Sequence, residues 1–330
     1  MPRPASSLRS WLWLFGLLVL VGVFHMIGAG AFSLIEMVKA LFAGPGDEPS
    51  QVVLWNLRLP RLVAAALVGG GLGVVGAAFQ ALFRNPLADP YILGVSSGAA
   101  VGGAIASLLP LAYAFGGLSS FLAAFATAAI GMLAVIAMAR RVAGRVQLAS
   151  LLLSGVAVGS FLWAAVTLVL VLAGQDSNRV LFWLLGSFSG MGWGKVVVLA
   201  LVTVGGCWYL FRSSRQLTVF ATGEETAMRL GIDTERLKRW TLFVGTAITA
   251  VAVSAVGIIG FVGLFVPHIA RRLFGPDLRV SIPASFLIGA SGMAAADLVA
   301  QRVLGGQEIN VGVVTALVGA PFLVTVLRRY

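Results

Sequence analysis

Three glycines in the segment GGGLGVVG have the spacing needed to bind a phosphate. Gly71, Gly73 and Gly76 match the dinucleotide fingerprint, in which a glycine-rich turn brings a pyrophosphate to the N-terminus of a helix. That chemistry requires a strand before the glycines and an acidic residue after a second strand, about twenty positions on. Here the flanking residues RLVAAALVG and VVGAAFQALF form one continuous apolar helical run, and Asp89 follows a proline-containing loop. The segment therefore predicts no nucleotide site.

Helix packing explains these glycines better. Gly69 and Gly73 are four residues apart, which predicts a flat strip on which a neighbouring helix packs closely in lipid. The segment SGMGWGKV resembles a Walker A motif, but Ser189 occupies its first glycine position and Val196 replaces its hydroxyl residue. We therefore expect this chain to bind no nucleotide.

Asp297 is the clearest polar residue within an apolar run. A charged carboxylate at membrane depth costs about 2.5–3.5 kcal/mol on insertion scales unless it is paired or near water. Asp297 could titrate in a proton relay, but no second carboxylate or lysine lies clearly at its depth, which favours a capping or helix-pairing role. His25 and His268 lie in separate runs and Cys207 is the only cysteine, so no metal site and no intrachain disulfide are predicted.

Composition determines which elements must position these residues. The 330 residues are 59% hydrophobic and 11% charged, which exceeds what a soluble core can bury. A membrane helix needs roughly 17–25 apolar residues. Such runs cover Trp11–Phe32, Leu62–Phe83, Ile92–Leu109, Ser120–Ala139, Leu148–Ala173, Val196–Phe211, Trp240–Ile259, Phe261–Phe274, Ile282–Leu304 and Val311–Leu327. We predict an all-α polytopic membrane protein with about ten transmembrane helices, forming one transmembrane domain over residues 1–330.

The placement of charge predicts the topology. The N-terminus could pass for a signal peptide, but its apolar stretch approaches span length, which favours a retained first helix. If the N-terminus is cytoplasmic and the spans alternate, most of the 23 lysines and arginines face the cytoplasm. The net charge of +11 therefore reflects membrane topology and does not predict nucleic-acid binding.

Two polar segments frame the outer side in this topology. Arg58 and Arg61 precede the second run, Arg302 lies near the outer end of the ninth, and Glu308 follows that run. Arginines at a span edge can reach to lipid headgroups. They can equally pair with carboxylates of a protein that docks on the outer rim.

Two further segments interrupt the runs on the inner side. Between the second and third runs, Pro86 and Pro90 prevent helix continuation, so this loop is either a plain turn or abuts a pathway. The longest polar segment, Arg212–Arg239, contains TGEETAMRLG. That string predicts a short helix in which Thr222 and Glu225 form a capping box, Gly231 ends the helix, and Ala227, Met228 and Leu230 form a small apolar face. This helix either joins two spans or is a docking site.

Several of these strings resemble the FecCD family, the permease subunits of ABC importers for iron-siderophores, haem and vitamin B12. They include LRLPRLVAAALVGGGLGVVGAAFQALFRNPLADPYILGVSSGA, LLLSGVAVGS, WLLGSFSGMGW, GIIGFVGLFVPHIARRLFGPD and INVGVVTALVGAPF. The resemblance implies a type II importer in the bacterial inner membrane: a homodimer of ten-helix permeases, two cytoplasmic ATPase subunits and a periplasmic binding protein. It also implies no cofactor on this chain, with ATP and Mg bound by the partner ATPase.

The resemblance also implies roles for individual residues. The binding-protein docking residues would be Arg58, Arg61, Arg302 and Glu308; the cytoplasmic gate, Asn85, Leu87, Arg141 and Arg145; the pathway lining, Ser154, Gly155, Gly159 and Ser160; and the ATPase coupling residues, Thr222, Gly223, Glu224, Glu225, Ala227, Met228, Leu230 and Gly231. In one departure, relatives have Glu-Leu-Pro where this chain has Glu308-Ile309-Asn310, which could change how the last helix begins.

These observations together predict a transport subunit that is not an enzyme. Its substrate would be a metal chelate, with a weak preference for haem or an iron chelate over cobalamin. Two alternatives stay open: a proton-coupled secondary transporter centred on Asp297, and a channel or membrane scaffold that needs no ATPase.

Overall fold

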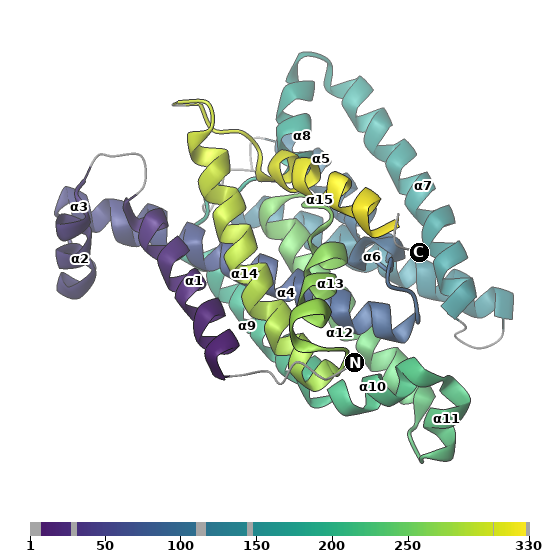
Figure 1. Cartoon of the computed structure of the whole chain (residues 1–330). Coiled ribbons are helices and arrows are strands. Elements are labelled where there is room, and N and C mark those ends of the chain that lie inside the picture. The colour runs from purple at the N-terminus through teal and green to yellow at the C-terminus, as the bar shows by residue number, and fades with distance from the viewer. Residues whose placement is uncertain (1–7, 28–31, 110–116, 144–147, 306, 328–330) are drawn as a thin grey trace.

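The computed structural model describes residues 8–27, 32–109, 117–143, 148–305 and 307–327, and within these ranges it is helical with no strand. Figure 1 shows long helices crossing one another, with short helices at both ends. The α-helices are α1 (Leu8–Ile27), α2 (Leu34–Ala43), α3 (Pro49–Val52), α4 (Leu59–Leu82), α5 (Val95–Leu108), α6 (Leu118–Ala143), α7 (Leu148–Ala173), α8 (Ser177–Leu184), α9 (Trp193–Arg212), α10 (Ser214–Thr222), α11 (Glu224–Arg229), α12 (Thr234–Val256), α13 (Val262–Phe274), α14 (Leu278–Arg302) and α15 (Val311–Leu327). Short π-helical or 3-10 segments cover Val53–Arg58, Pro90–Leu93 and Gly174–Asp176.

Each of the ten predicted runs contains one helix. Within the described residues, seven helical stretches are long and apolar enough to cross a membrane. Helices α5 and α15 are shorter apolar helices, and α13 has 13 residues, which gives a rise of about 20 Å. The prediction of an all-helical polytopic membrane protein is confirmed.

Helix α4 lies at the centre of the molecule and packs along α14 (Figure 1). The glycine strip makes this close approach possible. A side chain at Gly69 would collide with the carbonyl of Gly289 on α14, and a Cβ at Gly73 would lie 2.7 Å from the carbonyl oxygen of Ser285. A Cβ at Gly76 would collide with the backbone of Gly263 on α13. The predicted packing role of Gly69 and Gly73 is confirmed.

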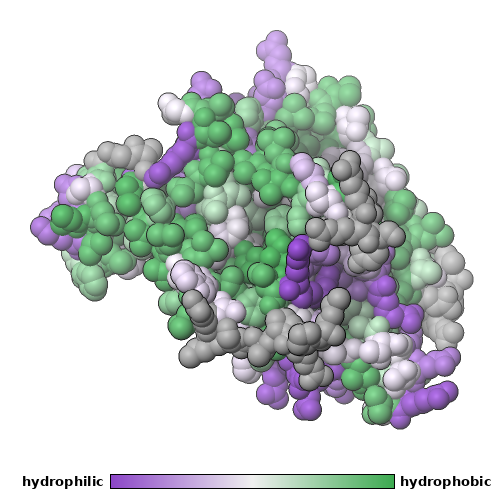
Figure 2. Space-filling model, viewed as in Figure 1, coloured by the Kyte–Doolittle hydropathy of each residue, from purple (hydrophilic) through white to green (hydrophobic). Residues whose placement is uncertain are grey.

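Helix α7 lies at the edge of the molecule instead. In the most apolar 18 residues of the stretch Leu148–Leu184, which contains α7, only 6% of the residues are buried. Phe161, Val171 and Leu172 of α7 are each more than 70% exposed. Figure 2 shows hydrophobic side chains covering much of the visible face. Apolar surface of this extent needs lipid or another protein chain to cover it.

Candidate functional site

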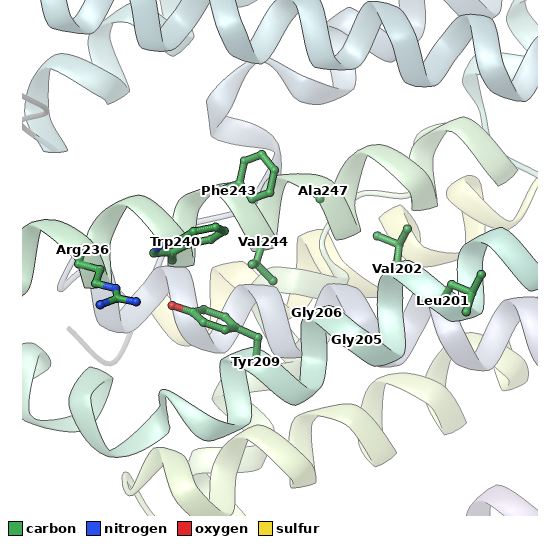
Figure 3. Close-up of a pocket in the computed structure, with 10 residues that line it drawn as sticks. All are labelled: Leu201, Val202, Gly205, Gly206, Tyr209, Arg236, Trp240, Phe243, Val244 and Ala247. Carbon is green, nitrogen blue, oxygen red and sulfur yellow. The ribbon is translucent and has the colours of Figure 1, made fainter.

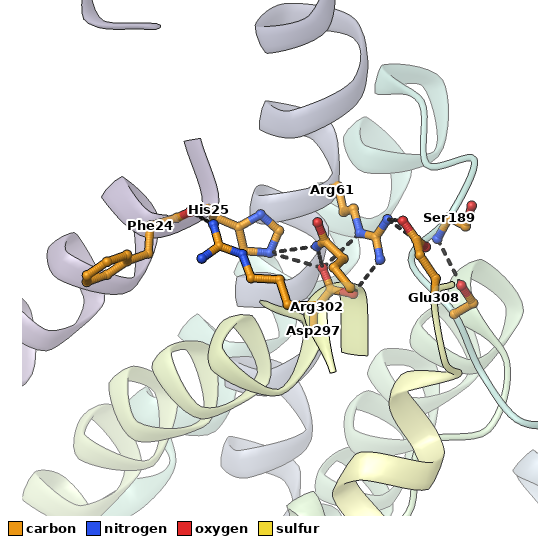
Figure 4. Close-up of polar contacts among 9 residues, drawn as sticks. Phe24, His25, Arg61, Ser189, Asp297, Arg302 and Glu308 are labelled. Atoms are coloured by element: carbon orange, nitrogen blue, oxygen red, sulfur yellow. Dashed lines mark hydrogen bonds and ion pairs between the residues drawn. The ribbon is translucent and has the colours of Figure 1, made fainter. Parts of the chain in front are cut away.

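A buried polar cluster joins α1, α4 and α14 (Figure 4). Its centre is Asp297 of α14, whose side chain is fully buried. Arg61 of α4 donates from Nε to Oδ2 at 2.8 Å and from Nη2 to Oδ1 at 2.9 Å. Nε2 of His25 on α1 lies 3.0 Å from Oδ2, and Nε2 of Gln301 donates to the same oxygen at 2.8 Å. The Asp297 carboxylate is therefore paired, as its burial requires.

Arg61 also binds the segment before α15. Its Nη1 donates to both carboxylate oxygens of Glu308, at 2.9 and 3.1 Å. The Arg61 side chain is 13% exposed and that of Glu308 is 45% exposed. We call His25, Arg61, Asp297, Gln301 and Glu308 the Asp297 cluster. It ties α1, α4, α14 and the start of α15 together.

Local sequence places each member of the cluster. Arg61 lies in the first turn of α4, and His25 lies in the last turn of α1. Asp297 and Gln301 are four residues apart on α14 and therefore share one helix face. In the alternating topology, the first run ends, the second begins and the ninth ends on the same side of the membrane. That shared depth is a sequence signal for the cluster. His25 is therefore not isolated, and Arg61 is used within the subunit.

The other two predicted docking arginines hold the end of α1. Arg58 donates from Nη1 to the carbonyl of Met26 and lies 3.5 Å from the sulfur of Met37. Nη2 of Arg302, an exposed residue, donates to the carbonyl of Phe24 at 3.3 Å (Figure 4). All three arginines thus converge on one rim, which the sequence analysis placed on the outer side. Their docking role stays a prediction.

Asn310 begins the next helix by contacting α8. Its Nδ2 donates to the carbonyl of Phe182 at 2.7 Å. A proline, which the family resemblance implies at this position in many relatives, has no side-chain amide with which to make such a bond. The departure noted in the sequence therefore adds a side-chain link between α15 and α8.

The predicted gate loop contains a tight polar turn. Asn85 is exposed and its Oδ1 accepts from the N–H of Leu87 at 2.9 Å. Leu87 is partly buried. Of the other predicted gate residues, Arg141 falls in the last turn of α6 and Arg145 lies outside the described residues. The gating role of these residues stays a prediction.

The rest of this loop is fastened to the helices behind it. Asp89 accepts from the N–H of Tyr91 at 2.9 Å, and the Tyr91 hydroxyl donates to the carbonyl of Ile259 at 2.8 Å. Gln80 donates to the carbonyls of Gly263 and Leu264, both at 3.2 Å. Burial raises the pKa of the Asp89 carboxyl to about 6, although the Tyr91 N–H opposes that rise. Protein groups thus satisfy this irregular backbone, as expected near a membrane.

The predicted coupling segment, Arg212–Arg239, forms α10, α11 and the first turns of α12. The expected capping box is wrong: Gly223 precedes α11 without a side-chain cap, and the Thr222 hydroxyl donates instead to the carbonyl of Val219. The expected helix stop is confirmed, because Gly231 has a φ of 78°. The coupling role of Thr222, Gly223, Glu224, Glu225, Ala227, Met228, Leu230 and Gly231 stays a prediction.

The apolar face of α11 divides between core and surface. Ala227 is fully buried, whereas Met228 is 52% exposed and Leu230 is 66% exposed. Lys238 of α12 donates to Glu224 at 2.8 Å and lies 2.5 Å from Glu235. This buried lysine, absent from the predicted site, anchors α11 to α12. The two exposed side chains are thus held on a firmly attached helix.

Helix α14 links the coupling segment to the Asp297 cluster. At its start, the N–H of Leu278 donates to the hydroxyl of Thr218 on α10 at 3.3 Å. Its 25 residues rise about 37 Å, which exceeds the roughly 30 Å hydrocarbon core of a bilayer. The two regions therefore lie at opposite ends of a membrane-length helix.

The predicted pathway residues of α7 lie partly against α5. Ser154 and Gly155 are buried, a Cβ at Gly159 would lie 3.7 Å from the hydroxyl oxygen of Ser97, and Ser160 is exposed. Within this subunit, packing accounts for the first three. Their role in lining a pathway stays a prediction.

The architecture is that of a multi-pass helical membrane protein. No group of three or more histidine, cysteine, aspartate or glutamate side chains within the described residues could hold a metal ion.

The comparisons with known proteins give the family. Residues 14–329 match the model of the FecCD transport family. Cobalamin import system permease protein BtuC of Halobacterium salinarum is 44% identical over 281 residues, 85% of this chain and 74% of that protein. Fe(3+)-citrate import system permease protein YfmD of Bacillus subtilis is 35% identical over 327 residues, 98% of this chain and 96% of that protein. A solved metal-chelate type ABC transporter in an inward-facing conformation has a TM-score of 0.85 and 30% identity, covering 98% of this chain and 99% of its own. The chain belongs to the FecCD transport family and is an importer permease of the BtuC type.

Proposed function

We propose that this chain carries a metal chelate across the bacterial inner membrane as the homodimeric permease of an ATP-driven importer, with cobalamin as the first substrate to test. The 44% identity to a permease named for cobalamin import carries the substrate proposal, because no other relative compared above is as similar. The 35% identity to a ferric citrate permease makes iron chelates the second group. Haem, preferred weakly in the sequence analysis, is the third.

The proposed mechanism uses both ends of α14. A loaded periplasmic binding protein docks on the rim that carries Arg58 and Arg302, and cytoplasmic ATPases bind at α11 on the other side. Closure of the ATPases on ATP displaces α11, and α14 carries that displacement toward the rim. The exposed apolar side chains of α7 support a second permease copy, because they leave surface to be covered.

The pairing of Asp297 supports this proposal over proton-coupled transport. Arg61 donates to both of its carboxylate oxygens, and His25 and Gln301 surround the same group. A carboxylate that relays protons must release such partners in each cycle, whereas a structural one keeps them.

Reconstitution tests the function. The permease is placed in liposomes with its ATPase and binding protein, and accumulation of cobalamin, ferric citrate and haem is measured by absorption. We expect ATP-dependent accumulation of cobalamin, no accumulation when ATP is omitted, and no effect of collapsing a proton gradient. Accumulation that follows the proton gradient without ATP would instead support the transporter centred on Asp297.

Two surface variants test the coupling role of α11. Met228→Ser and Leu230→Ser change exposed side chains, so we expect folding to be kept while substrate-stimulated ATP hydrolysis and uptake fall together. Arg229→Ser, on the same helix, is the matched control. Unchanged uptake in both serine variants would make α11 a simple connector.

A further inference from the structure

A groove of about 540 Å³ runs between α9 and α12 (Figure 3), and none of its lining residues belongs to the Asp297 cluster. Its floor lies on α9, where Gly205 and Gly206 carry no side chains. Ile248 of α12 fills the space beside Gly206, but a Cβ at Gly205 would meet no heavy atom within 4 Å. The groove is therefore open at Gly205.

Aromatic rings form one wall of the groove. The ring centroids of Tyr209 and Trp240 lie 6.3 Å apart, and those of Trp240 and Phe243 lie 5.8 Å apart. Trp240 is 44% exposed and Phe243 is 54% exposed. These rings and the bare backbone at Gly205 give the groove a largely apolar lining.

One end of the groove is positively charged. Figure 3 shows the Arg236 guanidinium and the Tyr209 hydroxyl at the same end, with Leu201 and Val202 at the other. Arg236 is exposed, and within the described part of the chain its guanidinium makes no ion pair. The two nearest acids along α12 are engaged elsewhere, because Asp233 caps the helix and Glu235 pairs with Lys238. A ligand at this end would meet positive charge.

The length and position of the groove indicate its occupant. Both helices are long and apolar enough to cross a membrane, so the groove opens toward acyl chains. Leu201 and Tyr209 are eight positions apart, which corresponds to about 12 Å along α9, close to half of the bilayer core. We propose that the groove binds one anionic phospholipid, with its phosphate at Arg236 and the Tyr209 hydroxyl and one acyl chain lying over Gly205.

Native mass spectrometry of the full-length chain in mild detergent tests this site. The probes are phosphatidylglycerol and phosphatidylcholine of equal chain length. We expect one phosphatidylglycerol to bind preferentially, and Arg236→Gln to weaken that binding about fivefold while leaving phosphatidylcholine unchanged. Arg239→Gln, which removes a charge from the same helix outside the groove, should change neither lipid.

Variants that fill the groove test whether an acyl chain lies over Gly205. Gly205→Leu occupies the open floor, and Ala247→Leu narrows the groove from α12 as a second variant. Both should weaken the two lipids together, with the melting temperature kept as the check on folding. Gly194→Leu is the control, because its Cβ also meets no heavy atom within 4 Å but lies outside the groove.

Three outcomes would contradict all or part of the proposal. Lipid counts that stay equal in wild type, Gly205→Leu and Ala247→Leu would place the bound lipid elsewhere. A change from dimer to monomer in both filling variants, without loss of lipid, would make the groove an interface between copies of this chain. An unchanged lipid preference in Arg236→Gln would remove the headgroup assignment.

Discussion

Arg61 and Asp297 form a two-point contact between α4 and α14, with Nε and Nη2 each facing a different carboxylate oxygen at 2.8 and 2.9 Å. Such paired hydrogen bonds fix orientation as well as distance. The contact places the first turn of α4 against the last turns of α14. Through His25 it also holds the end of α1 at the same rim.

Removing the Asp297 carboxylate should strongly destabilise the subunit. In Asp297→Ala the Arg61 charge stays buried without its main partner, which costs about 3–5 kcal/mol in comparable buried pairs. The melting temperature of the purified permease measures the effect. Glu308→Gln is the matched control, because the Glu308 side chain is 45% exposed and its pair with Arg61 should be worth about 1 kcal/mol or less. Equal losses in the two variants would contradict the central role of Asp297.

Reversing the charge at Arg302 should slow docking of the binding protein and leave the fold intact. Arg302 is exposed, and exposed charges act mainly on association rate. We expect Arg302→Glu to lower the association rate several-fold at low salt, and about 0.5 M salt to reduce the difference. Lys39→Glu makes the same charge change at an exposed residue of α2. Binding kinetics that respond equally to both changes would indicate a general charge effect and not a docking site at Arg302.

A methyl group at Gly73 should damage the α4 and α14 packing. Its Cβ would lie 2.7 Å from the Ser285 carbonyl oxygen and 2.8 Å from Cγ1 of Val266, so the helices must separate. We expect Gly73→Ala to cost about 1–3 kcal/mol of unfolding free energy, the range for overpacked cores. Gly292→Ala on α14 meets no heavy atom within 4 Å and should be neutral or slightly stabilising. Thermal melts of Gly73→Ala and Gly292→Ala measure the difference in stability. Equal melting temperatures would contradict close packing of α4 and α14 at Gly73.

The Asp89 carboxyl should make stability depend on pH. Its pKa is raised to about 6 by burial in the loop between α4 and α5, so the folded state favours the protonated form. The stabilisation is therefore complete below the unfolded pKa near 4 and is lost as pH rises through about 6. Asp89→Asn keeps an acceptor for the Tyr91 N–H but cannot ionise. We expect the variant to match wild type near pH 4 and to melt higher at pH 7.5; parallel melting curves across that range would contradict this.

Much of the fold could be predicted from local sequence. The ten apolar runs each contain a helix because a helix is one of the few arrangements that satisfies the backbone of an apolar segment in lipid. Gly69 and Gly73 could be identified as packing residues because their four-residue spacing places them on one helix face. Gly231 could be identified as a helix stop because glycine readily adopts the left-handed backbone that ends many helices, and its φ in the structure is 78°. Each of these predictions depends on neighbours along the chain.

The cluster and the details of the coupling segment depend on distant neighbours. Arg61 lies 236 positions from Asp297, so no local pattern indicates that its charge is used inside the subunit. The spacing of Thr222 and Glu225 fits a capping box, yet the backbone turns at Gly223, with a φ of 151°, and Thr222 bonds to the preceding turn. The role of Lys238 could not be predicted for a similar reason, because its partner Glu224 lies on a separate helix.

The glycine contact between α4 and α14 has a consequence for transport. The main chains of α4 and α14 touch at Gly69 and Gly289 without an intervening layer of side chains, so we expect the two helices to move together. In the proposed dimer, we expect any widening of the route to come from elements that are less buried within the subunit, and α7 is such an element. Helices α4 and α14 thus form the more rigid part of the subunit, and we expect the change between open states to involve α7.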